Sequence, residues 1–573
     1  MRLGAELITV SGSPQVVIVG AGFSGITASR VLARAGVNVL LIDRNCYHTF
    51  IPLLYQVATG FLQPQQVIYP VHRILKKYPQ ARFLQAEVYD IDFNRQIAQT
   101  EAGEIDYNYL ILATGSQPQF SGVPGASEYG KPLVSLSDAV KLRQHLLGCI
   151  EQAKQELSEE RRKMLLTFVV VGGGPTGVEM AGGLCELLKS LLSKNYPLFR
   201  QLSEVILLQS RDRLLVSFPE KLSRYTAQHL QKMGVKLQFS TRVQRVSPEG
   251  VELENGTIIP TATTIWTAGV EANPATDTEN LSTAHKRKIV VEQTLQIPNY
   301  DTVYAIGDVA YVKLGDEPLA GVAPEALQQG EATADNILRQ MRGESPQPFE
   351  YIDKGRAAII GRNAGVVSKD ELQLQGISGW LIWLGIHLYY LPGGRNRLNV
   401  AYCWIRDLLQ QSRFLQPIIP PYPEFKSFPL NDKPILTVSQ GAKPMKYIPL
   451  IGRAFLSSIF LYSAITKIFG FAATQEMIAS RGLPFPALML LGNIIFQLIG
   501  GISLILGYKT RIGAVILILF LIPTTLVFHN FLADPGETTA FLKNLALIGS
   551  LLMVSYFGAG PVSLDTGSRV DKI

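Results

Sequence analysis

The sequence predicts an α/β protein with two nucleotide-binding domains, followed by a helical segment at a membrane surface and an all-α bundle of four transmembrane helices. Three observations predict this architecture: two glycine-rich turns that each join an apolar strand to a helix, a short apolar stretch rich in aromatic residues, and four long apolar segments near the C-terminus. The chain has 573 residues, of which 47% are hydrophobic and 17% are charged. It is therefore too long for a single domain and too apolar for a disordered protein.

The charge pattern and the cysteines exclude several classes of function. The net charge of +7 is spread along the chain, and no stripe of Lys and Arg is interleaved with aromatic residues. We therefore expect no nucleic-acid partner and a preference for an anionic lipid bilayer. No two of the four cysteines form a C-x-x-C motif, which excludes a zinc cage, an iron–sulfur cluster and a dithiol redox pair. We expect no metal site. The cysteines are Cys46, Cys149, Cys185 and Cys403.

A complete βαβ unit occupies residues 16–43. It consists of an apolar strand, a G-x-G-x-x-G turn, a helical stretch and a second apolar strand, which is the full context of a dinucleotide-binding motif. Gly20 allows the tight turn, Gly22 lets a pyrophosphate approach, and Gly25 lets the helix pack on its strand. The helix N-terminus favours negative charge, and Asp43 is placed to bind a ribose diol.

A second glycine-rich turn predicts a second nucleotide-binding domain. The apolar strand 168–171 leads into a turn with Gly172, Gly174 and Gly177, and a helix follows. The next strand ends at Gln209, where a domain specific for NADH usually has an acid.

The neutral residue at this strand end bears on nucleotide specificity. A carboxylate repels the 2′-phosphate of NADPH, and Gln209 removes that repulsion. Arg211 and Arg213 could also pair with the phosphate. We expect NADPH to be tolerated, although the Gln209 amide could instead bind the ribose of NADH.

Two further turns point to a flavin in the first domain. One strand ends in Thr114 and Gly115, and another ends in Gly307 and Asp308. The order of these pieces resembles the two-dinucleotide-binding-domain flavoproteins, in which one Rossmann-like domain binds FAD and an inserted second one binds a nicotinamide nucleotide. The resemblance implies that Asp308 contacts the ribityl chain of FAD.

Residues 14 to about 413 resemble the type II NADH dehydrogenases, which are single-chain NAD(P)H:quinone oxidoreductases that do not pump protons. The resemblance implies hydride transfer from NADH or NADPH to FAD, followed by two-electron reduction of a membrane quinone. It rests on an ordered set of motifs at 41–44, 51–60, 172–179, 265–269, 305–308, 353–355, 360–361, 380–387 and 395–398.

Candidate site residues combine those that the glycine turns predict with those that the resemblance implies. The FAD residues are Gly20, Gly22, Gly25, Asp43, Arg44, Val88, Thr114, Gly115, Gly307 and Asp308. The residues for NADH or NADPH are Gly172, Gly174, Gly177, Glu179, Gln209 and Gly269. The quinone residues are Gln328, Gln329 and Lys354.

The resemblance assigns catalytic roles to Glu179 and Lys354. Glu179 would face the nicotinamide and flavin rings and relay protons to the quinone; it could also be a first-turn acid favoured by the helix dipole. Lys354 would stabilise negative charge that develops on the quinone, or it is a solvated turn lysine. The family's quinone motif A-Q-x-A-x-Q-x-G is present at 323–330 with Pro324 in place of its first Gln, so the identity of the quinone stays open.

Residues 377–391 form an apolar segment that is shorter than the roughly 20 residues needed to cross a bilayer. Its four aromatic residues and the following Arg395 and Arg397 indicate a helix that lies in the membrane interface. A buried core helix is the alternative.

Beyond a proline-rich linker at 416–436, four apolar segments are long enough to span a membrane. They cover 448–469, 486–508, 511–530 and 543–560. The side shared with the nucleotide domains carries Lys443, Lys446, Arg453, Lys509, Arg511, Arg569 and Lys572. The opposite side carries Lys467, Arg481 and Lys543. This asymmetry, and a first segment unlike a signal peptide, predict nucleotide domains on the cytosolic face of a plasma membrane or thylakoid-type membrane.

Residues 444–566 resemble the DoxX-like four-helix membrane proteins. The resemblance rests on Arg453, Lys467, Arg481-Gly482, Gly500-Gly501, Gly507, Thr510-Arg511, His529 and Lys543-Asn544. Polar residues are costly in lipid, so those inside the spans should face the bundle interior, where they line a small-molecule cleft or hold helices together. For His529, near a span end, solvation is a third alternative. The polar residues are Asn493, Gln497, His529 and Asn544.

The predicted domains are an FAD-binding domain at 14–165 and 285–350, an NAD(P)H-binding domain at 166–284, a quinone-site and membrane-surface segment at 351–413, a linker at 414–443, and the DoxX-like domain at 444–566. Two other functions stay open: an NADPH-dependent reductase of a quinone precursor such as a demethylated naphthoquinone, and a membrane-anchored sensor of the NAD(P)H/quinone ratio. The family often dimerises, so a homodimer also stays open.

The variant Gln209→Glu tests the predicted tolerance of NADPH. A carboxylate at this position should repel the 2′-phosphate and lower the ratio of kcat/KM for NADPH to that for NADH. Steady-state kinetics with both nucleotides measure this ratio. A ratio that does not fall would contradict the prediction.

Overall fold

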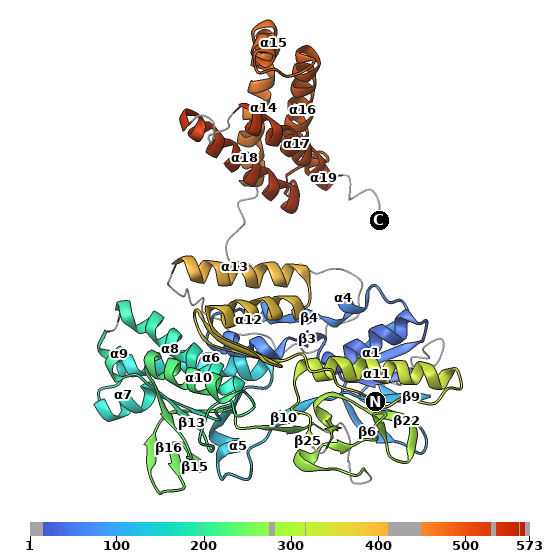
Figure 1. The fold of residues 1–573 in the computed structure, drawn as a ribbon, viewed down its shortest axis with the longest axis vertical. Helices are drawn as coiled ribbons and strands as arrows, with labels where there is room; N and C mark the ends of the chain where they lie inside the picture. Colours follow the sequence, from blue (N-terminus) through green and yellow to red (C-terminus); the bar gives the residue numbers. More distant parts are fainter. Residues whose placement is uncertain are drawn as a thin grey trace, which may run out of the picture. The chain divides into compact units, whose positions relative to one another are not determined.

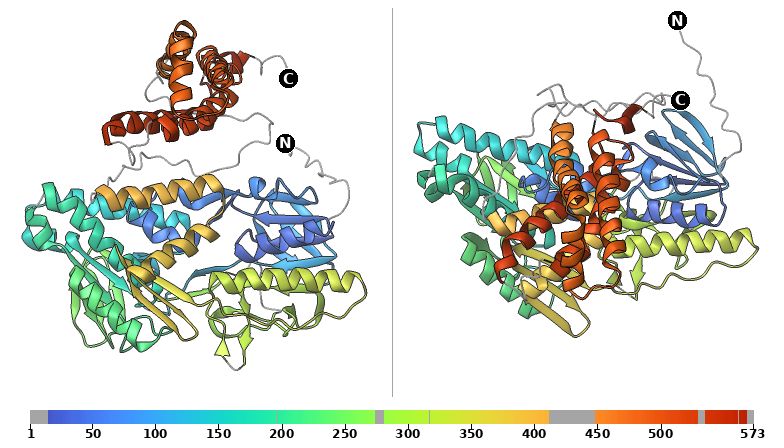
Figure 2. Two further views of the ribbon diagram at one scale, coloured as in Figure 1. Left: turned by 45° about the horizontal axis from the view of Figure 1, so that its top comes forward. Right: turned by 90° about the horizontal axis from the view of Figure 1, so that it is seen from above.

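The structure, a computed structural model, describes residues 15–195, 197–273, 281–315, 317–410, 448–528, 535–560 and 562–567. Its internal contacts divide the chain into two compact units, Met1–Tyr422 and Pro423–Ile573. The predicted linker at 414–443 lies outside the described residues. Figures 1 and 2 show the α/β unit in blue to gold and the helical unit in orange to red.

The first nucleotide domain contains a six-stranded sheet in the order β21–β22–β9–β1–β2–β5. Every pair is parallel except β21–β22. Strand β1 is buried along its whole length, as expected for an apolar strand in the middle of a parallel sheet. The strands are β1 (Val16–Val19), β2 (Val39–Asp43), β5 (Ala81–Gln85), β9 (Tyr109–Leu112), β21 (Gln296–Ile297) and β22 (Tyr300–Ala305).

The second nucleotide domain contains a five-stranded parallel sheet in the order β11–β18–β12–β13–β14. Its edge strand β11 precedes the predicted domain boundary at 165/166, so this sheet begins earlier in the chain than predicted. A short strand without apolar alternation gave no signal for this pairing. The strands are β11 (Gly130–Pro132), β12 (Thr167–Val171), β13 (Glu204–Leu208), β14 (Val235–Gln238) and β18 (Thr263–Trp266).

Helices follow the glycine-rich turns in both domains. Helix α1 (Phe23–Arg34) begins after the first turn and packs against α11 (Ala323–Met341). Helix α8 (Pro175–Asn195) begins after the second turn. Each helix N-terminus therefore lies at the carboxyl end of a parallel strand, where this class of fold binds its ligands.

A three-stranded antiparallel sheet, β26 (Arg356–Gly361), β27 (Ala364–Lys369) and β28 (Leu372–Gly376), packs against α8. The contact is close at Gly182, where an added Cβ would lie 1.7 Å from the Ile360 carbonyl oxygen. Any side chain at this position would push β26 away. The glycine thus lets the later sheet lie directly on the nucleotide-binding helix.

Two helices, α12 (Ile377–Tyr390) and α13 (Gly394–Gln410), lie side by side at one edge of this unit (Figure 1). Trp380 and Trp383 are buried. One face of α12 is therefore packed in the core, as the alternative prediction of a buried core helix for 377–391 requires. The other face agrees with an interfacial helix, because large apolar side chains are exposed on both helices. They are Ile377, Leu381, Ile382, Ile386, Tyr389, Tyr390, Leu398, Tyr402, Ile405 and Leu408.

The described residues of the second unit form helices and no strands, and four of these helices are long and apolar enough to cross a membrane. This confirms the predicted four-helix bundle. The short helix α15 was not predicted. The helices are α14 (Ile448–Phe469), α15 (Phe471–Ser480), α16 (Pro486–Leu506), α17 (Thr510–Phe528), α18 (Thr538–Phe557) and α19 (Leu564–Gly567).

Polar side chains inside the bundle bond across helices. The Lys467 ammonium of α14 donates to Asn493 Oδ1 of α16 over 3.2 Å, and Gln497 Nε2 donates to the same oxygen over 2.7 Å. Asn544 Nδ2 of α18 donates to Thr525 Oγ1 of α17 over 3.0 Å. The bonds Lys467–Asn493 and Asn544–Thr525 hold helices together, as one predicted alternative requires, whereas Gln497–Asn493 lies within α16. His529 lies outside the described residues.

Candidate active site

Two glycines of the first glycine-rich turn differ in their surroundings: Gly25 packs against the backbone, whereas Gly22 faces open space. An added Cβ on Gly25 would lie 1.9 Å from the Gly20 carbonyl oxygen, whereas one on Gly22 would meet no atom within 4 Å. Gly20 itself has φ +110°, which disfavours a side chain. The open space at Gly22 adjoins the N-terminus of α1, so a phosphate fits there.

The second turn repeats this geometry. Gly172 has φ +111°, an added Cβ on Gly177 would lie 1.8 Å from the Gly172 carbonyl oxygen, and one on Gly174 would meet nothing within 4 Å. Two independent segments of the chain thus leave the same open space at a helix N-terminus, where a phosphate can approach.

The residue at the end of the second strand holds each glycine-rich turn. Asp43 Oδ2 accepts a hydrogen bond of 2.7 Å from the Ala21 backbone N–H, and Oδ1 accepts one of 2.7 Å from Asn45 N–H. Burial raises the pKa of Asp43, and these two N–H donors act in the opposite direction. Arg44, the next residue, is exposed.

Gln209 occupies the corresponding place in the second domain. Its Oε1 accepts from the Gly173 backbone N–H over 3.3 Å, and its Nε2 donates to the Arg213 carbonyl oxygen over 2.9 Å. The Arg213 guanidinium donates to the Val216 carbonyl oxygen over 3.0 Å. Arg211 is exposed and makes no side-chain hydrogen bond or ion pair within the described residues. Of the two arginines, Arg211 is thus the freer one for a phosphate.

The other predicted FAD residues lie around the first turn, with one exception. The Asp308 carboxylate accepts from Ser116 Oγ over 2.9 Å, and burial raises its pKa. Gly115 has φ +74° and open space at its Cβ position, which leaves room beside Thr114 for a ligand. An added Cβ on Gly307 would lie 2.8 Å from Ser24 Oγ in α1.

Val88 is the exception. It is buried at the start of strand β6 (Val88–Asp92) and pairs with Thr100 of a separate three-stranded sheet. Its proposed contact with FAD stays a prediction. In the second domain, Gly269 has φ +144°, and its carbonyl oxygen accepts from Gln119 N–H over 3.1 Å.

Glu179 lies where α8, β26 and α12 meet. Its Oε1 accepts hydrogen bonds from Trp383 Nε1 over 3.2 Å and from the Ile359 backbone N–H over 3.3 Å. Burial raises the pKa of this carboxyl to about 8. Because α8 begins at Pro175, Glu179 lies in its second turn, so the alternative of a first-turn acid favoured by the helix dipole is wrong.

Sequence reasoning gave no role to His387 of α12, although its spacing from Trp383 places both on one helix face. The two rings stack with centroids 3.7 Å apart, and Nδ1 of His387 donates to the Trp383 carbonyl oxygen over 2.7 Å. Phe50 meets the imidazole edge-on at 6.1 Å. Burial lowers the pKa of His387 to about 4, so the ring is neutral near pH 7.

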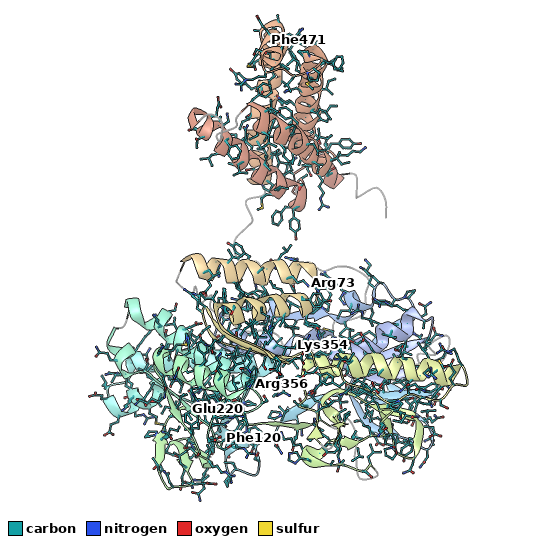
Figure 3. All side chains as sticks on the ribbon, viewed as in Figure 1. Arg73, Phe120, Glu220, Lys354, Arg356 and Phe471 are labelled. Atoms are coloured by element: carbon teal, nitrogen blue, oxygen red, sulfur yellow. The ribbon has the colours of Figure 1, made fainter. Side chains whose placement is uncertain are left out.

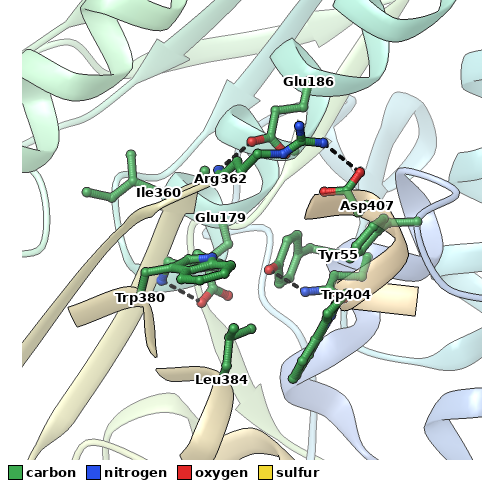
Figure 4. Close-up of a pocket in the computed structure, with 14 residues that line it drawn as sticks. Tyr55, Glu179, Glu186, Ile360, Arg362, Trp380, Leu384, Trp404 and Asp407 are labelled. Carbon is green, nitrogen blue, oxygen red and sulfur yellow. Dashed lines mark hydrogen bonds and ion pairs between the residues drawn. The ribbon is translucent and has the colours of Figure 1, made fainter. Parts of the chain in front are cut away.

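A cavity of about 40 Å³ adjoins Glu179. Figure 4 shows Glu186, Arg362 and Asp407 near one another, and Glu179 beside Trp380 on the side toward Leu384. The remaining lining residues are Tyr55, Gln56, Phe61, Gly183, Ile359, Ile360, Gly361, Trp380, Leu384 and Trp404.

The predicted quinone residues are bonded within the chain. The Gln328 amide pairs with the backbone of Ile352, accepting from its N–H over 2.9 Å and donating to its carbonyl over 3.0 Å. Gln329 Oε1 accepts from Gly307 N–H over 2.7 Å. Lys354 is exposed, near the middle of the α/β unit (Figure 3). Their roles toward a quinone stay predictions.

Two family models match the chain. The pyridine nucleotide-disulphide oxidoreductase model matches residues 14–330, and the DoxX model matches residues 448–530. Over 418 residues the chain is 34% identical to the type II NADH:quinone oxidoreductase Ndh of Mycobacterium tuberculosis, covering 70% of this chain and 89% of that protein. It is 30% identical over 361 residues to the type II NADH:quinone oxidoreductase of Staphylococcus aureus, covering 61% and 89%.

Solved structures share the fold. NDH2 from Plasmodium falciparum in complex with NADH has a TM-score of 0.65 at 18% identity, covering 71% of this chain and 100% of that chain. The sulfide:quinone oxidoreductase from Aquifex aeolicus has a TM-score of 0.54 at 16% identity, covering 70% and 96%. These likenesses confirm the predicted α/β fold.

The pKa of Glu179 predicts how its contribution to stability depends on pH. Its folded-state pKa of about 8 exceeds the ordinary value of 4.5, so the folded protein binds the proton more tightly than the unfolded chain. The stabilisation is therefore complete below pH 4.5 and is lost as the pH rises to about 8. Compared with Glu179→Gln, the wild-type melting temperature should fall over this interval and level off above it. Thermal unfolding of both proteins between pH 4.5 and 9 checks this, and a constant difference would contradict it.

Proposed function

The chain belongs to the pyridine nucleotide-disulphide oxidoreductase family and, within it, to the type II NADH:quinone oxidoreductases, and from this premise we propose that it is a membrane-bound, non-proton-pumping enzyme that uses FAD to transfer electrons from NADH to a membrane quinone. One observation carries the proposal. Glu179, on the helix that follows the nicotinamide-binding turn, is bonded to Trp383 on the helix whose outer face is apolar and exposed. A single buried carboxyl thus connects the nucleotide site with the candidate membrane surface.

The residues of the first domain fit FAD. The open space at Gly22 would accommodate the pyrophosphate, Asp43 at the strand end would bind the ribose, and Asp308 is proposed to contact the ribityl chain. When bound, FAD supplies the two-electron chemistry that no protein side chain provides, accepting a hydride from the nicotinamide and passing the electron pair to the quinone.

The cysteines favour a diffusible electron acceptor. All four are free, and no two of them form a disulfide beside the site. The exposed apolar faces of α12 and α13 would lie in the membrane interface, next to a lipid-soluble quinone. The four candidate spans of the second unit would anchor the protein.

Glu179 would supply a proton to the quinone. Its raised pKa keeps the carboxyl protonated near pH 7, so it holds a proton that it can donate. Trp383 and Ile359 orient this carboxyl through its Oε1 atom. Lys354 would stabilise the negative charge on the reduced quinone before the proton arrives.

NADPH is proposed as a second donor. No carboxylate at the end of β13 repels a 2′-phosphate, and Arg211 is exposed nearby. The nucleotide domains are proposed to lie on the cytosolic face, because the loops on their side of the membrane carry more Lys and Arg than the opposite loops.

Anaerobic stopped-flow spectroscopy tests the proposed reaction. The purified protein should be yellow, NADH should bleach its flavin absorbance, and a quinone should restore it. Naphthoquinones and benzoquinones compared in the second step identify the acceptor. A colourless protein that takes up no FAD on reconstitution would overturn the proposal.

Two matched glycine variants separate cofactor binding from folding. Gly22→Ala places a methyl group in the open phosphate space, so the protein should fold normally but bind FAD roughly tenfold more weakly or worse. Gly25→Ala clashes with the Gly20 carbonyl and should destabilise the fold by about 1–3 kcal/mol or more.

Melting temperatures after flavin removal, together with FAD titration, distinguish the two effects. Equal stability losses in both variants would show that Gly22 also acts through packing.

A further inference from the structure

One face of α8 connects the buried Glu179 with a second acid near the surface. Glu179, Gly183 and Glu186 are spaced four and three residues apart, so they lie along the same side of the helix. All three line the cavity beside Glu179. Gly183 lies between the two acids along the helix, and an added Cβ there would lie 3.1 Å from Thr59 Cγ2 and 3.4 Å from Tyr55 Cδ2, so any side chain would crowd this part of the cavity.

The outer end of the cavity is charged and partly exposed. The Glu186 carboxylate accepts from the backbone N–H of Arg362, and the Arg362 guanidinium forms a 2.7 Å ion pair with Asp407 of α13. The Arg362 side chain is 28% exposed and that of Asp407 is 11% exposed. Arg362 thus contacts Glu186 of α8 through its backbone and Asp407 of α13 through its side chain, and its partly exposed side chain keeps the cluster within reach of solvent.

The inner end offers one unbonded carboxylate oxygen. Both hydrogen bonds to Glu179 end on Oε1, and Oε2 accepts none within the described residues. Tyr55 of α2 (Leu54–Ala58) also lines the cavity, and the His387 ring stacks on Trp383. The cavity volume of about 40 Å³ is large enough for ordered water, and the lining groups provide the polar partners that such water needs.

The proposed reaction requires a route of this kind. NADH, one proton and a quinone give NAD⁺ and a quinol, so the hydride supplies two electrons and one proton, and the second proton must come from solution. A buried carboxyl that donates this proton has to be reprotonated before the next turnover. Glu179 is buried, with 9% relative exposure, where α8, β26 and α12 meet.

We propose that this cavity is the proton-uptake path of the enzyme: Glu186 takes a proton from solution, water in the cavity carries it past Gly183, and Oε2 of Glu179 receives it. The Arg362–Asp407 pair fixes Arg362, whose backbone N–H in turn positions the Glu186 carboxylate at the outer end. The delivery of this proton to a quinone rests on the proposed function, whereas the existence of the path does not depend on it.

The first test is infrared spectroscopy of the full-length protein after transfer from H₂O to D₂O. The carbonyl band of the protonated Glu179 carboxyl, identified by its loss in Glu179→Gln, should shift quickly in the wild type. Glu186→Gln retains an oxygen that can accept from the Arg362 N–H but cannot carry the proton. It should slow this shift at least about tenfold, and Glu186→Asp should restore it.

Stopped-flow kinetics provide the second readout. Glu186→Gln should leave the rate of flavin bleaching by NADH unchanged, lower the turnover with quinone at least about tenfold, and increase its solvent isotope effect. Glu151→Gln is the matched control, because Glu151 forms an exposed ion pair with Lys154 far along α6 (Leu136–Gln155) and does not line the cavity.

The outcomes are distinguishable. A wild-type rate of Glu179 deuteration in Glu186→Gln overturns the path, even if turnover falls. A wild-type protein that never reduces a quinone overturns the proposed function, and the deuteration rate still decides the path. If Glu186→Gln does not fold, Gly183→Ala tests the same route, since its methyl group narrows the cavity and should slow the exchange.

Discussion

The hydrogen bond between Trp383 and Glu179 is the interaction on which the candidate site depends. It joins the helix that follows the second glycine-rich turn to the helix that exposes an apolar face. A carboxyl in such surroundings is costly to bury, and the cost appears as a pKa raised to about 8 rather than as an ion pair. A group that titrates near physiological pH in a buried place is more useful for proton transfer than for stability.

Close backbone contacts at glycines make that interaction possible. Gly182 lets β26 lie on α8, and this brings the Ile359 N–H within reach of Glu179. Gly365 performs a similar task one strand later, because an added Cβ there would lie 2.7 Å from the Trp380 backbone nitrogen. Neither glycine belongs to a phosphate-binding turn. They fix the distance between layers, and so determine which side chains can meet in the site.

The two nucleotide domains use one local design with different chemistry at the strand end. Asp43 and Gln209 both accept a hydrogen bond from the middle residue of their glycine-rich turn. Holding the turn therefore needs only an oxygen acceptor, and the charge at this position is free to vary with the nucleotide. This separates the structural task of the residue from its proposed part in distinguishing NADH from NADPH.

The sequence by itself determined the two nucleotide domains, the four candidate spans and most of the residues around the phosphate gaps. These features depend on short-range patterns: a strand and helix joined by glycines, or about 20 consecutive apolar residues. The tertiary structure decided the rest. It placed β11 in the second sheet, turned Gln328 toward the backbone of Ile352, and brought Glu179, Glu186 and Asp407 to one cavity from helices more than 200 residues apart. Contacts between distant segments arise from packing that no local pattern encodes, so the charged groups around the buried carboxyl became visible only in the folded chain.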